Sequence, residues 1–498
     1  MTREPGPPRL GLAVAAWITF LASGSVLVLE IAAGRLLAPY VGVSLATYTG
    51  IIGVMLAGIA LGAWLGGRIA DARPPAPLIG PALAAGGLAA MAGVPIVAVV
   101  GGAASGTGFG PIVLLAAAGF AAPAAILSAA APLVVRATLR DMATSGSVVG
   151  QLSAAGTGGA ILGTFLTGFV LLGLLPTRVL IVAVGVLLVV LGMGVRWWLT
   201  RRSPGPPLAL AAALLVAAGA AIPAGPCDRE SAYYCIAILP DPDRPSGRTL
   251  MLDRLRHAYV DLADPLHLEF GYVRRFADVA LPILDRTGGA AEVLHIGGGG
   301  FSFPRYLRAI APASRHTVLE LDPVVVATAR ERLGLVESRE LRVVAGDARL
   351  SIRALPDEGF DLVVGDAFGG LSVPWHLTTR EFVAEVDRVL RADGQYTLNL
   401  IDGPRLLFVR AEVATLRERF AHVALVASPA SLRGESGGNV VLVASHAPID
   451  ATALEAQATT WGDGPATEVV TGAALDRLTG SARPLTDDEA PVDQLIAR

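Results

Sequence analysis

Residues 292–301 are Glu292-Val-Leu-His-Ile-Gly-Gly-Gly-Gly-Phe301, a short apolar stretch that runs directly into four glycines. The apolar stretch is typical of a buried strand, and the glycines allow the backbone to approach a ligand closely. The residues that follow predict a helix, whose first N–H groups are free to bind a ligand. A strand, a glycine turn and a helix in this order indicate a domain that holds a nucleoside-bearing cofactor.

Strands and helices alternate beyond this point, which predicts a mostly parallel, Rossmann-like α/β sheet with helices on both faces. We expect strands at 291–296, 316–320, 341–345, 360–365, 394–400, 421–427 and 438–444. We expect helices at 302–310, 323–332, 348–354, 378–391 and 406–419. Upstream, β-type patterns at 231–239 and 248–262 predict a small β subdomain, followed by a helix at 265–284. The polar stretch 450–498 is interpreted as a helix plus a tail.

The first 225 residues predict a multi-pass α-helical membrane domain. Seven apolar runs occur there, at about 11–31, 45–66, 78–101, 111–134, 154–174, 178–198 and 207–224. Most are long enough to cross a hydrocarbon core roughly 30 Å thick, and the last is the shortest. We therefore expect a transmembrane domain at 1–225, the β subdomain plus a helix at 226–290, and a nucleoside-binding catalytic domain with its tail at 291–498.

Charge differs between the two halves of the chain. Residues 1–225 hold 11 arginines and 4 acids, whereas residues 226–498 hold 28 arginines and 38 acids. The acidic soluble half argues against nucleic-acid binding and suits cationic ligands. The chain has no lysine, which excludes a P-loop lysine and a Schiff-base lysine. Its histidines are scattered and its two cysteines are eight residues apart, so no metal site is predicted.

Arginine placement predicts the orientation in the membrane. Most arginines of the first half lie before run one or after runs two, four and six, and only Arg35 and Arg178 lie in the opposite loops. The positive-inside rule then puts the N-terminus in the cytoplasm, and seven crossings put the soluble domain outside. An extracytoplasmic domain would allow a disulfide between Cys227 and Cys235, while two free thiols are the alternative.

Acidic residues follow three successive strands of the predicted sheet. Glu320 ends the second strand, at a distance from the glycines that suits a carboxylate bound to ribose hydroxyls. Asp347 follows the third strand, where an acid can accept from an adenine amino group, and Asp366 follows the fourth, nearest the expected reacting carbon. Ligands bind at the carboxyl ends of such strands. The alternative is that each acid only caps a helix.

These features, within residues 229–445, resemble the spermidine synthase (aminopropyltransferase) family. The matching pieces are Glu230-Ser-Ala-Tyr-Tyr234, Leu252-Asp253, Glu269-Phe-Gly-Tyr272, Ile296-Gly-Gly-Gly299, Glu320-Leu-Asp322, Gly346-Asp347, Asp366-Ala-Phe-Gly-Gly370 and His376-Leu-Thr-Thr-Arg-Glu-Phe382. With the apolar runs and the ending Leu485-Thr-Asp-Asp-Glu-Ala-Pro-Val492, the whole chain resembles the membrane-fused spermidine synthase-like proteins of bacteria. The resemblance implies a class I methyltransferase fold and a multi-pass location in the bacterial inner membrane, with the lipid bilayer as a partner, and it leaves a homodimer open.

The resemblance also implies roles for individual residues. Asp366 would orient and deprotonate an attacking amine, and Tyr272 would help to place that amine. The donor would be S-adenosylmethionine or its decarboxylated form, and no metal is implied. The expected enzyme is an aminopropyltransferase-like alkyltransferase that joins the donor to a small amine and releases 5'-methylthioadenosine. The residues that would hold the donor are Gly297, Gly298, Gly299, Glu320 (ribose), Asp347 (adenine), His257 and Ala348.

Two departures from the family pattern leave alternatives open. Gly300 and Gly369 stand where the family has aspartates that bind the amine end of the donor and the acceptor diamine. Asp487 and Asp488 either fold back to replace these acids or are solvated. Without the acceptor anchors, the donor's own amine could attack and give a cyclic product. The other hypotheses are methyl transfer, which would give adenosylhomocysteine, and a nucleoside-binding sensor or transporter.

Overall fold

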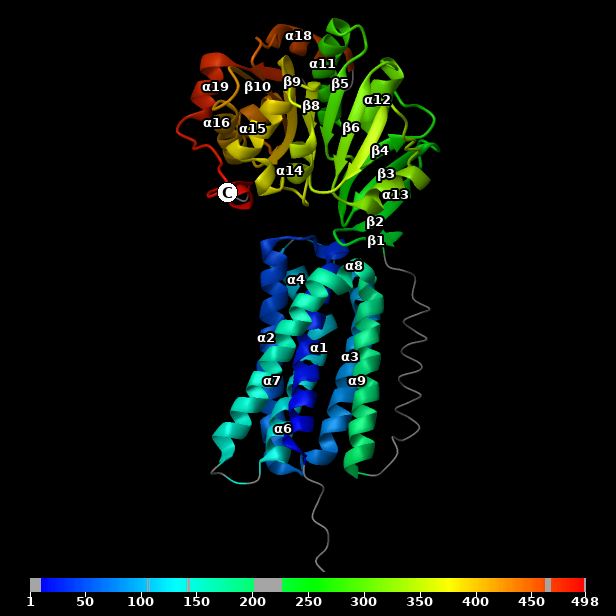
Figure 1. The fold of residues 1–498 in the computed structure, drawn as a ribbon, viewed down its shortest axis with the longest axis vertical. Helices are drawn as coiled ribbons and strands as arrows, with labels where there is room; N and C mark the ends of the chain where they lie inside the picture. Colours follow the sequence, from blue (N-terminus) through cyan, green and yellow to red (C-terminus); the bar gives the residue numbers. More distant parts are fainter. Residues whose placement is uncertain are drawn as a thin grey trace, which may run out of the picture. The chain divides into compact units, whose positions relative to one another are not determined.

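The computed structural model describes residues 10–104, 106, 108–139, 141, 144–200, 226–461 and 467–496. The chain forms two compact units, Met1–Ile236 and Ala237–Arg498 (Figure 1). Buried apolar side chains form one large cluster in the first unit and two in the second. The seventh apolar run, 207–224, lies outside the described residues.

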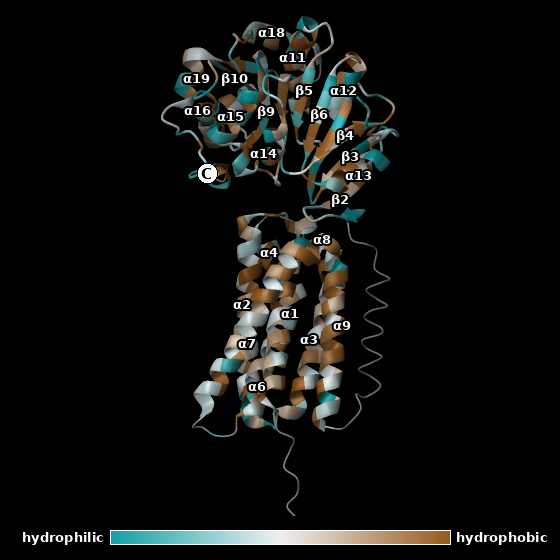
Figure 2. Cartoon of the chain, in the orientation of Figure 1, coloured by the Kyte–Doolittle hydropathy of each residue, from teal (hydrophilic) through white to brown (hydrophobic). Residues whose placement is uncertain are grey.

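The first unit is a bundle of long apolar helices (Figure 2). Within the described residues, six helices are long and apolar enough to cross a membrane, which is compatible with the predicted multi-pass helical domain. Four of them are α1 (Leu12–Val41), α2 (Leu45–Ala72), α3 (Ala76–Ala103) and α9 (Thr177–Thr200). The other two, Phe109–Thr138 and Ser145–Leu174, are interrupted by π-type turns at Ala117–Ala121 and Thr167–Leu171. Their pieces are α4 (Phe109–Ala116), α5 (Ala122–Ser128), α6 (Ala130–Thr138), α7 (Ser145–Leu166) and α8 (Leu172–Leu174).

Small residues allow these helices to touch at their backbones. A Cβ on Gly159 of α7 would lie 2.0 Å from the Phe20 carbonyl oxygen of α1. A Cβ on Gly62 of α2 would lie equally close, 2.0 Å, to the Ala125 carbonyl oxygen of α5. Close backbone approach of this kind lets apolar helices pack without large side chains between them. Gly62 and Gly159 therefore serve helix packing.

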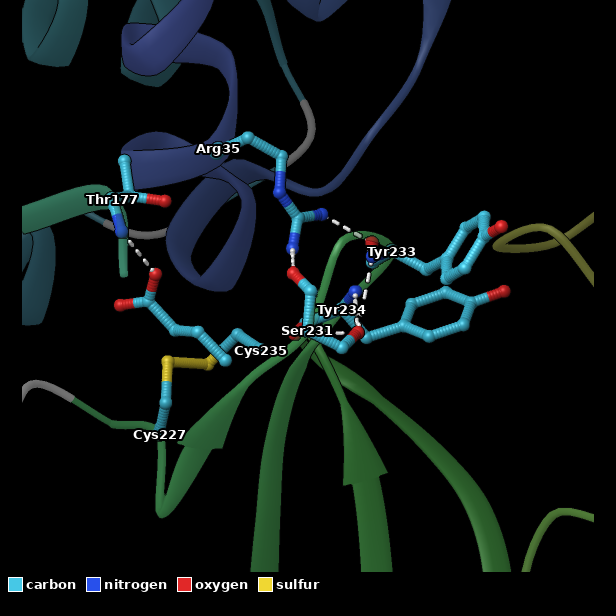
Figure 3. Close-up of a disulfide and its surroundings, with 8 residues drawn as sticks. Arg35, Thr177, Cys227, Ser231, Tyr233, Tyr234 and Cys235 are labelled. Atoms are coloured by element: carbon cyan, nitrogen blue, oxygen red, sulfur yellow. Dashed lines mark hydrogen bonds between the residues drawn. A yellow bond between two sulfur atoms is a disulfide. The ribbon is translucent and has the colours of Figure 1, made fainter. Parts of the chain in front are cut away.

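A disulfide-closed segment packs on one end of this bundle, within the first unit (Figure 3). Cys227 and Cys235 are joined, so the free-thiol alternative is wrong. The Arg35 guanidinium, near the end of α1, donates to the carbonyl oxygens of Tyr233 and, at 3.0 Å, Ser231. The first N–H of α9, that of Thr177, donates to Glu230 Oε2 at 2.8 Å. The segment is thus fixed at the end of the bundle where α1 ends and α9 begins.

A small antiparallel sheet and a helix come next. The sheet has the order β1-β2-β3-β4, with β1 at Arg229–Glu230, β2 at Cys235–Pro240, β3 at Gly247–Leu252 and β4 at Leu255–Asp261. The boundary between the two units falls inside β2. The helix α11 is Gly271–Arg286, which starts six residues later than predicted. Its apolar face, including Phe276 and Ile283, is buried against the main sheet.

The main sheet of the second unit has eight strands in the order β12-β10-β11-β9-β8-β5-β6-β7. The strands β7, β6, β5, β8 and β9 are parallel, while β11 runs antiparallel to both β9 and β10. This confirms the mostly parallel Rossmann-like sheet. The strands are β5 (Glu292–Ile296), β6 (Arg315–Glu320), β7 (Leu341–Ala345), β8 (Phe360–Gly365), β9 (Leu390–Asp402), β10 (His422–Ala427), β11 (Gly438–Ser445) and β12 (Glu468–Val470).

Helices cover both faces of this sheet. Along β8, Leu362 and Val364 pack with α11 on one face, whereas Val363 packs with α15 and α16 on the other. Alternate side chains of a strand point to opposite faces, so both faces of β8 are apolar and buried. The helices are α12 (Ser302–Ile310), α13 (Pro323–Arg332), α14 (Ala348–Ser351), α15 (Arg380–Val389), α16 (Leu407–Leu416), α17 (Pro429–Leu432), α18 (Ala451–Ala458), α19 (Gly472–Thr479) and α20 (Val492–Ile496).

The stretch after residue 450 contains more structure than the predicted helix and tail. Besides α18, α19 and α20, it supplies the edge strand β12, whose Val469 and Val470 pair with β10. A strand of three residues has too short an apolar pattern to be recognised, and it forms because the edge of β10 offers it hydrogen-bond partners.

Candidate active site

The glycine turn lies at the carboxyl end of β5, packed against the end of β8. Gly297 and Gly299 have φ angles of +97° and +49°, which favour glycine over other residues. A Cβ on Gly297 would lie only 2.3 Å from the Asp366 carbonyl oxygen. The turn is therefore shaped by close contact with the strand that carries Asp366.

Glu320 is the last residue of β6, and its carboxylate binds the backbone of the glycine turn. Its Oε2 accepts hydrogen bonds from the N–H groups of Gly298, at 2.8 Å, and Gly299, at 3.1 Å, and its Oε1 accepts from the N–H of Asp322, at 3.0 Å. Burial raises the pKa of Glu320, and these backbone hydrogen bonds oppose the rise. Glu320 thus orders the turn, and its contact with a ribose stays a prediction.

Asp347 caps the short helix α14. Its Oδ1 accepts from the N–H groups of Arg349, at 2.8 Å, and Leu350, at 3.3 Å. Its Oδ2 lies 3.4 Å from His376 Nε2, and Ala348 is buried beside it. Asp347 therefore caps a helix, which is the alternative considered from the sequence. Its second carboxylate oxygen, Oδ2, remains directed at His376. Contact of Asp347 and Ala348 with an adenine stays a prediction.

Asp366, directly after β8, is held by two hydrogen-bond donors. The Tyr272 hydroxyl, from the first turn of α11, donates to Oδ2 at 3.1 Å, and Asn399 Nδ2, from β9, donates to Oδ1 at 3.1 Å. Burial raises the pKa of Asp366 to about 6, although both hydrogen bonds lower it. Burial and the charge of Asp366 raise the pKa of Tyr272 well above its usual value, so this phenol remains a donor. The two predicted catalytic residues thus lie together.

Asn399 and Asn439 complete this arrangement and were not predicted. Asn439 Nδ2, on β11, donates at 3.0 Å to Asn399 Oδ1, which leaves the Asn399 amino group directed at Asp366. Asn399 is only 1% exposed. A polar side chain in the middle of an otherwise apolar buried strand was the available signal, since such groups are retained only when they are hydrogen-bonded.

Two cavities meet beside Asp366. A cavity of about 60 Å³ is lined by the glycine turn, Ser302, His257, Tyr272 and Asp366. A larger cleft of about 510 Å³ shares His257, Tyr272 and Phe368 with it and continues along Asn399 and Asn439. Burial lowers the pKa of His257 to about 4, so its ring is neutral near pH 7. Glu320, Asp347 and Ala348 lie at the neighbouring strand ends, outside the lining of either cavity.

Gly300 and Gly369, which stand where the family pattern has aspartates, have different surroundings. A Cβ on Gly300 would lie 2.7 Å from the Ala258 Cβ, so the turn has no room for a side chain there. At Gly369 the nearest atom to an added Cβ is 3.9 Å away, so a side chain would fit. Asp487 instead accepts from Thr379 Oγ1 at 2.7 Å and binds Arg349, and neither Asp487 nor Asp488 lines the two cavities.

In the described part of the chain, no group of three or more His, Cys, Asp or Glu could hold a metal ion.

The second unit, with its glycine turn and acids at the carboxyl ends of parallel strands, has a Rossmann-like α/β fold. A family model described as a methyltransferase domain matches residues 294–398. The chain is 34% identical over 169 residues to a polyamine aminopropyltransferase of Vibrio vulnificus, which covers 34% of this chain and 54% of that protein. A second polyamine aminopropyltransferase, of Chromobacterium violaceum, is 28% identical over 147 residues, covering 29% of this chain and 54% of that protein.

Among solved structures, a probable spermidine synthase of Corynebacterium glutamicum is similar, with a TM-score of 0.49 and 27% identity. The matched region covers 51% of this chain and 94% of the Corynebacterium glutamicum chain. The chain spans about half the length of the curated relatives it matches. These relatives confirm the predicted resemblance: the second half of the chain is similar to proteins named polyamine aminopropyltransferases.

Proposed function

We propose that this protein is a membrane-anchored, spermidine synthase-like alkyltransferase. An amine nitrogen attacks the sulfur-bound carbon of the donor's amine-bearing alkyl chain, in S-adenosylmethionine or its decarboxylated form. The carbon–sulfur bond breaks, its electron pair stays on sulfur, and neutral 5'-methylthioadenosine leaves. The observation that carries this proposal is Asp366, held by Tyr272 and Asn399 where the two cavities meet.

Asp366 is suited to accept the proton that the amine releases. An attacking amine must be neutral, and a carboxylate within hydrogen-bond reach can orient it and take its proton. With a pKa of about 6, Asp366 is ionised near neutral pH yet more basic than an ordinary aspartate. Tyr272 and Asn399 donate to one carboxylate oxygen each, which fixes the plane of the carboxylate. Positioning of this kind supplies much of the acceleration in a displacement reaction.

The donor would occupy the strand ends around the smaller cavity. In this proposal Gly297, Gly298 and Gly299 face the sulfonium-bearing tail, while Glu320 and Asp347 bind the ribose and adenine. The neutral ring of His257 and the methyl group of Ala348 would complete the site. A neutral histidine is compatible with a positively charged sulfonium, which an imidazolium would repel.

Methyl transfer is the second candidate function. The observation that favours it is the match of residues 294–398 to a methyltransferase domain. It predicts a different nucleoside product, adenosylhomocysteine, because the methyl carbon rather than the longer alkyl chain leaves the sulfur. The relatives named polyamine aminopropyltransferases favour the first candidate, whereas the pairing of Tyr272 with Asp366 suits either transfer to an amine, since both release a proton.

The product formed by the purified protein tests the proposal. With an active donor and amine, we expect methylthioadenosine, and Asp366→Asn should lower its formation by roughly 10²–10⁴-fold. Asp357→Asn is a matched control, because the Asp357 side chain is 75% exposed and pairs with Arg388 away from both cavities. Methylthioadenosine formed at an equal rate by Asp366→Asn would contradict the proposed role of Asp366.

We also propose that the soluble unit lies on the extracytoplasmic side of a bacterial inner membrane. Arg68 and Arg196 lie four residues before the ends of α2 and α9, and Arg73 directly follows α2, at the end of the bundle opposite Arg35. The positive-inside rule assigns the arginine-rich end to the cytoplasm. The disulfide-closed segment is fixed at the other end by Arg35 and Thr177, and disulfides persist in oxidising compartments. Both observations support the same side.

A further inference from the structure

Two buried histidines on neighbouring strands are hydrogen-bonded to each other. His295, on β5, is two residues before Gly297, and its Nε2 lies 3.1 Å from Nδ1 of His316 on β6. Val293 and His316 are register partners, so His295, two residues further on, has its side chain on the same face of the sheet as His316. Each histidine is only 2% exposed. The proposed mechanism gives neither ring a role.

The hydrogen bonds around this pair define which ring nitrogens carry protons. The single hydroxyl proton of Ser314 is donated to the Ala311 carbonyl oxygen at 2.5 Å, so Ser314 Oγ accepts from His316 Nε2, 2.9 Å away. His316 Nδ1 is then an acceptor, and His295 Nε2 donates to it. Burial lowers the pKa of His295 well below its usual value and that of His316 to about 4, so both rings are neutral near pH 7. Nδ1 of His295 thus keeps a lone pair.

His295 lines the smaller cavity beside Asp366. Its ring meets the Phe303 ring edge-on, with the centroids 5.9 Å apart, and Phe303 lines the same cavity. The contacts with Phe303 and His316 fix the orientation of the His295 ring. Among the described residues Nδ1 of His295 has no hydrogen-bond partner, and it is not one of the fully enclosed polar atoms that lack a partner. This nitrogen is therefore open to the cavity.

The amine-bearing chain of the donor needs an acceptor of this kind. Both forms of the donor carry an ammonium on the alkyl chain that is transferred, and a buried ammonium without a partner is strongly disfavoured. In the proposed function Asp366 receives the attacking amine. Gly300 lines the smaller cavity as well, and a side chain there would meet Ala258, with its Cβ 2.7 Å from the Ala258 Cβ. The aspartate of the family pattern is therefore replaced neither at Gly300 nor by Asp366.

We propose that Nδ1 of His295 accepts a hydrogen bond from the donor's ammonium and so positions the alkyl chain that is transferred. This inference rests on the proposed function, because it requires the donor to occupy the smaller cavity. His295 is a binding residue in this assignment. His316 and Ser314 are positioning residues, which act through His295 by keeping the lone pair on Nδ1.

Two nucleosides that differ only in the chain on sulfur provide the test. Methylthioadenosine carries a methyl group, S-adenosyl-3-thiopropylamine carries an aminopropyl chain, and neither thioether alkylates an amine. Their binding to the full-length protein in detergent is measured by isothermal titration calorimetry. We expect His295→Leu to weaken binding of the aminopropyl nucleoside by about tenfold or more, the worth of a hydrogen bond to a charged group. Methylthioadenosine should bind as it does to the wild type, which also shows that the variant is folded.

Further variants separate the lone pair from the shape of the ring. His295→Asn should retain most of the affinity for the aminopropyl nucleoside, because the asparagine Oδ1 can take the place of Nδ1. Ser314→Ala removes the acceptor that fixes the tautomer, and should weaken this binding by a smaller factor than His295→Leu. His422→Leu is the control, because His422 is an exposed histidine of β10 that lines neither cavity.

The outcomes distinguish this inference from the proposed function. Unchanged binding of both nucleosides by His295→Leu, or equal weakening of both, would overturn the inference and leave alkyl transfer intact. If His295→Leu does not fold, Ser314→Ala decides, and a wild-type preference for the aminopropyl nucleoside in that variant would overturn the inference. In turnover, His295→Leu should raise KM for the donor and leave KM for the amine unchanged, and the reverse pattern would also reject it. A wild-type protein that binds neither nucleoside would overturn the proposed function itself.

Discussion

Asp366 must be ionised to accept a proton, and its surroundings set the pKa of its carboxyl group. Burial raises its pKa to about 6, while the hydrogen bonds from Asn399 and Tyr272 lower it. The carboxylate form is therefore lost as the pH falls through about 6. We expect kcat/KM to decline below that pH, on top of the separate decline caused by protonation of the acceptor amine.

Asn399→Ala should move this decline to higher pH. Without the Asn399 amino group the carboxylate form loses a hydrogen bond, and the pKa of Asp366 should rise further by about one unit. Thr397→Val is the control, since Thr397 lies two residues away on the same strand and its buried hydroxyl has no hydrogen-bond partner among the described residues. A lower rate with an unchanged pH profile would mean that Asn399 has only a structural role.

The sequence predicted Asp366 and the glycine turn because each follows a recognisable strand, and it predicted Tyr272 and His257 through the resemblance to the spermidine synthase family. Asn399 and Asn439 were missed, since their roles come from the side-by-side pairing of β9 and β11, which are joined by about 40 residues of chain. The contacts of Asp487 could not be predicted from the sequence either. Its partner Arg349 lies on α14, far from it along the chain.

The elements around the site were predicted closely where their apolar pattern is long. Strands β5 to β8 and helices α12 and α13 agree with the predicted ranges to within about one residue. The start of α11 was wrong by six residues, because Leu266, Leu268 and Phe270 extend the apolar pattern yet lie before the helix, with Leu268 buried. Apolar spacing shows that a helix exists, whereas its first residue depends on local packing.

Gly297→Ala tests the link between the glycine turn and Asp366, which directly follows β8. A methyl group at this position would meet the Asp366 carbonyl oxygen, and its φ of +97° disfavours alanine. We expect at least about tenfold weaker binding of methylthioadenosine and a larger loss of turnover, because donor and Asp366 are displaced together. Gly403→Ala, whose new Cβ would have its nearest contact at 3.4 Å, should bind the nucleoside normally. Equal binding by both variants would contradict this account of the turn.

At the scale of the whole molecule, hydropathy and charge alone separated a part made of long apolar helices from an α/β part. The pairing of Cys227 with Cys235 could not be decided in that way, because a spacing of eight residues is compatible with both bonded and free thiols. The contacts of Arg35 and Thr177 with the segment between the cysteines were also beyond prediction.

Thiol labelling and reporter fusions test the proposed orientation. The chain has only two cysteines, so a maleimide reports on this pair alone. We expect no labelling of the protein from intact cells until it is reduced, and a C-terminal reporter that is active only outside the cytoplasm. Rapid labelling without reductant, together with a reporter active in the cytoplasm, would place the soluble unit on the other side.

The fate of the sulfur-bound methyl group tests the central claim most directly. Donor carrying a ¹³C-methyl group is incubated with the full-length protein and an amine, and the label is followed in the nucleoside and in the acceptor by mass spectrometry. Alkyl transfer predicts that all of the label remains in the nucleoside, as labelled methylthioadenosine, because the methyl–sulfur bond is never broken. Label in the acceptor with unlabelled adenosylhomocysteine would contradict the account and identify the protein as a methyltransferase.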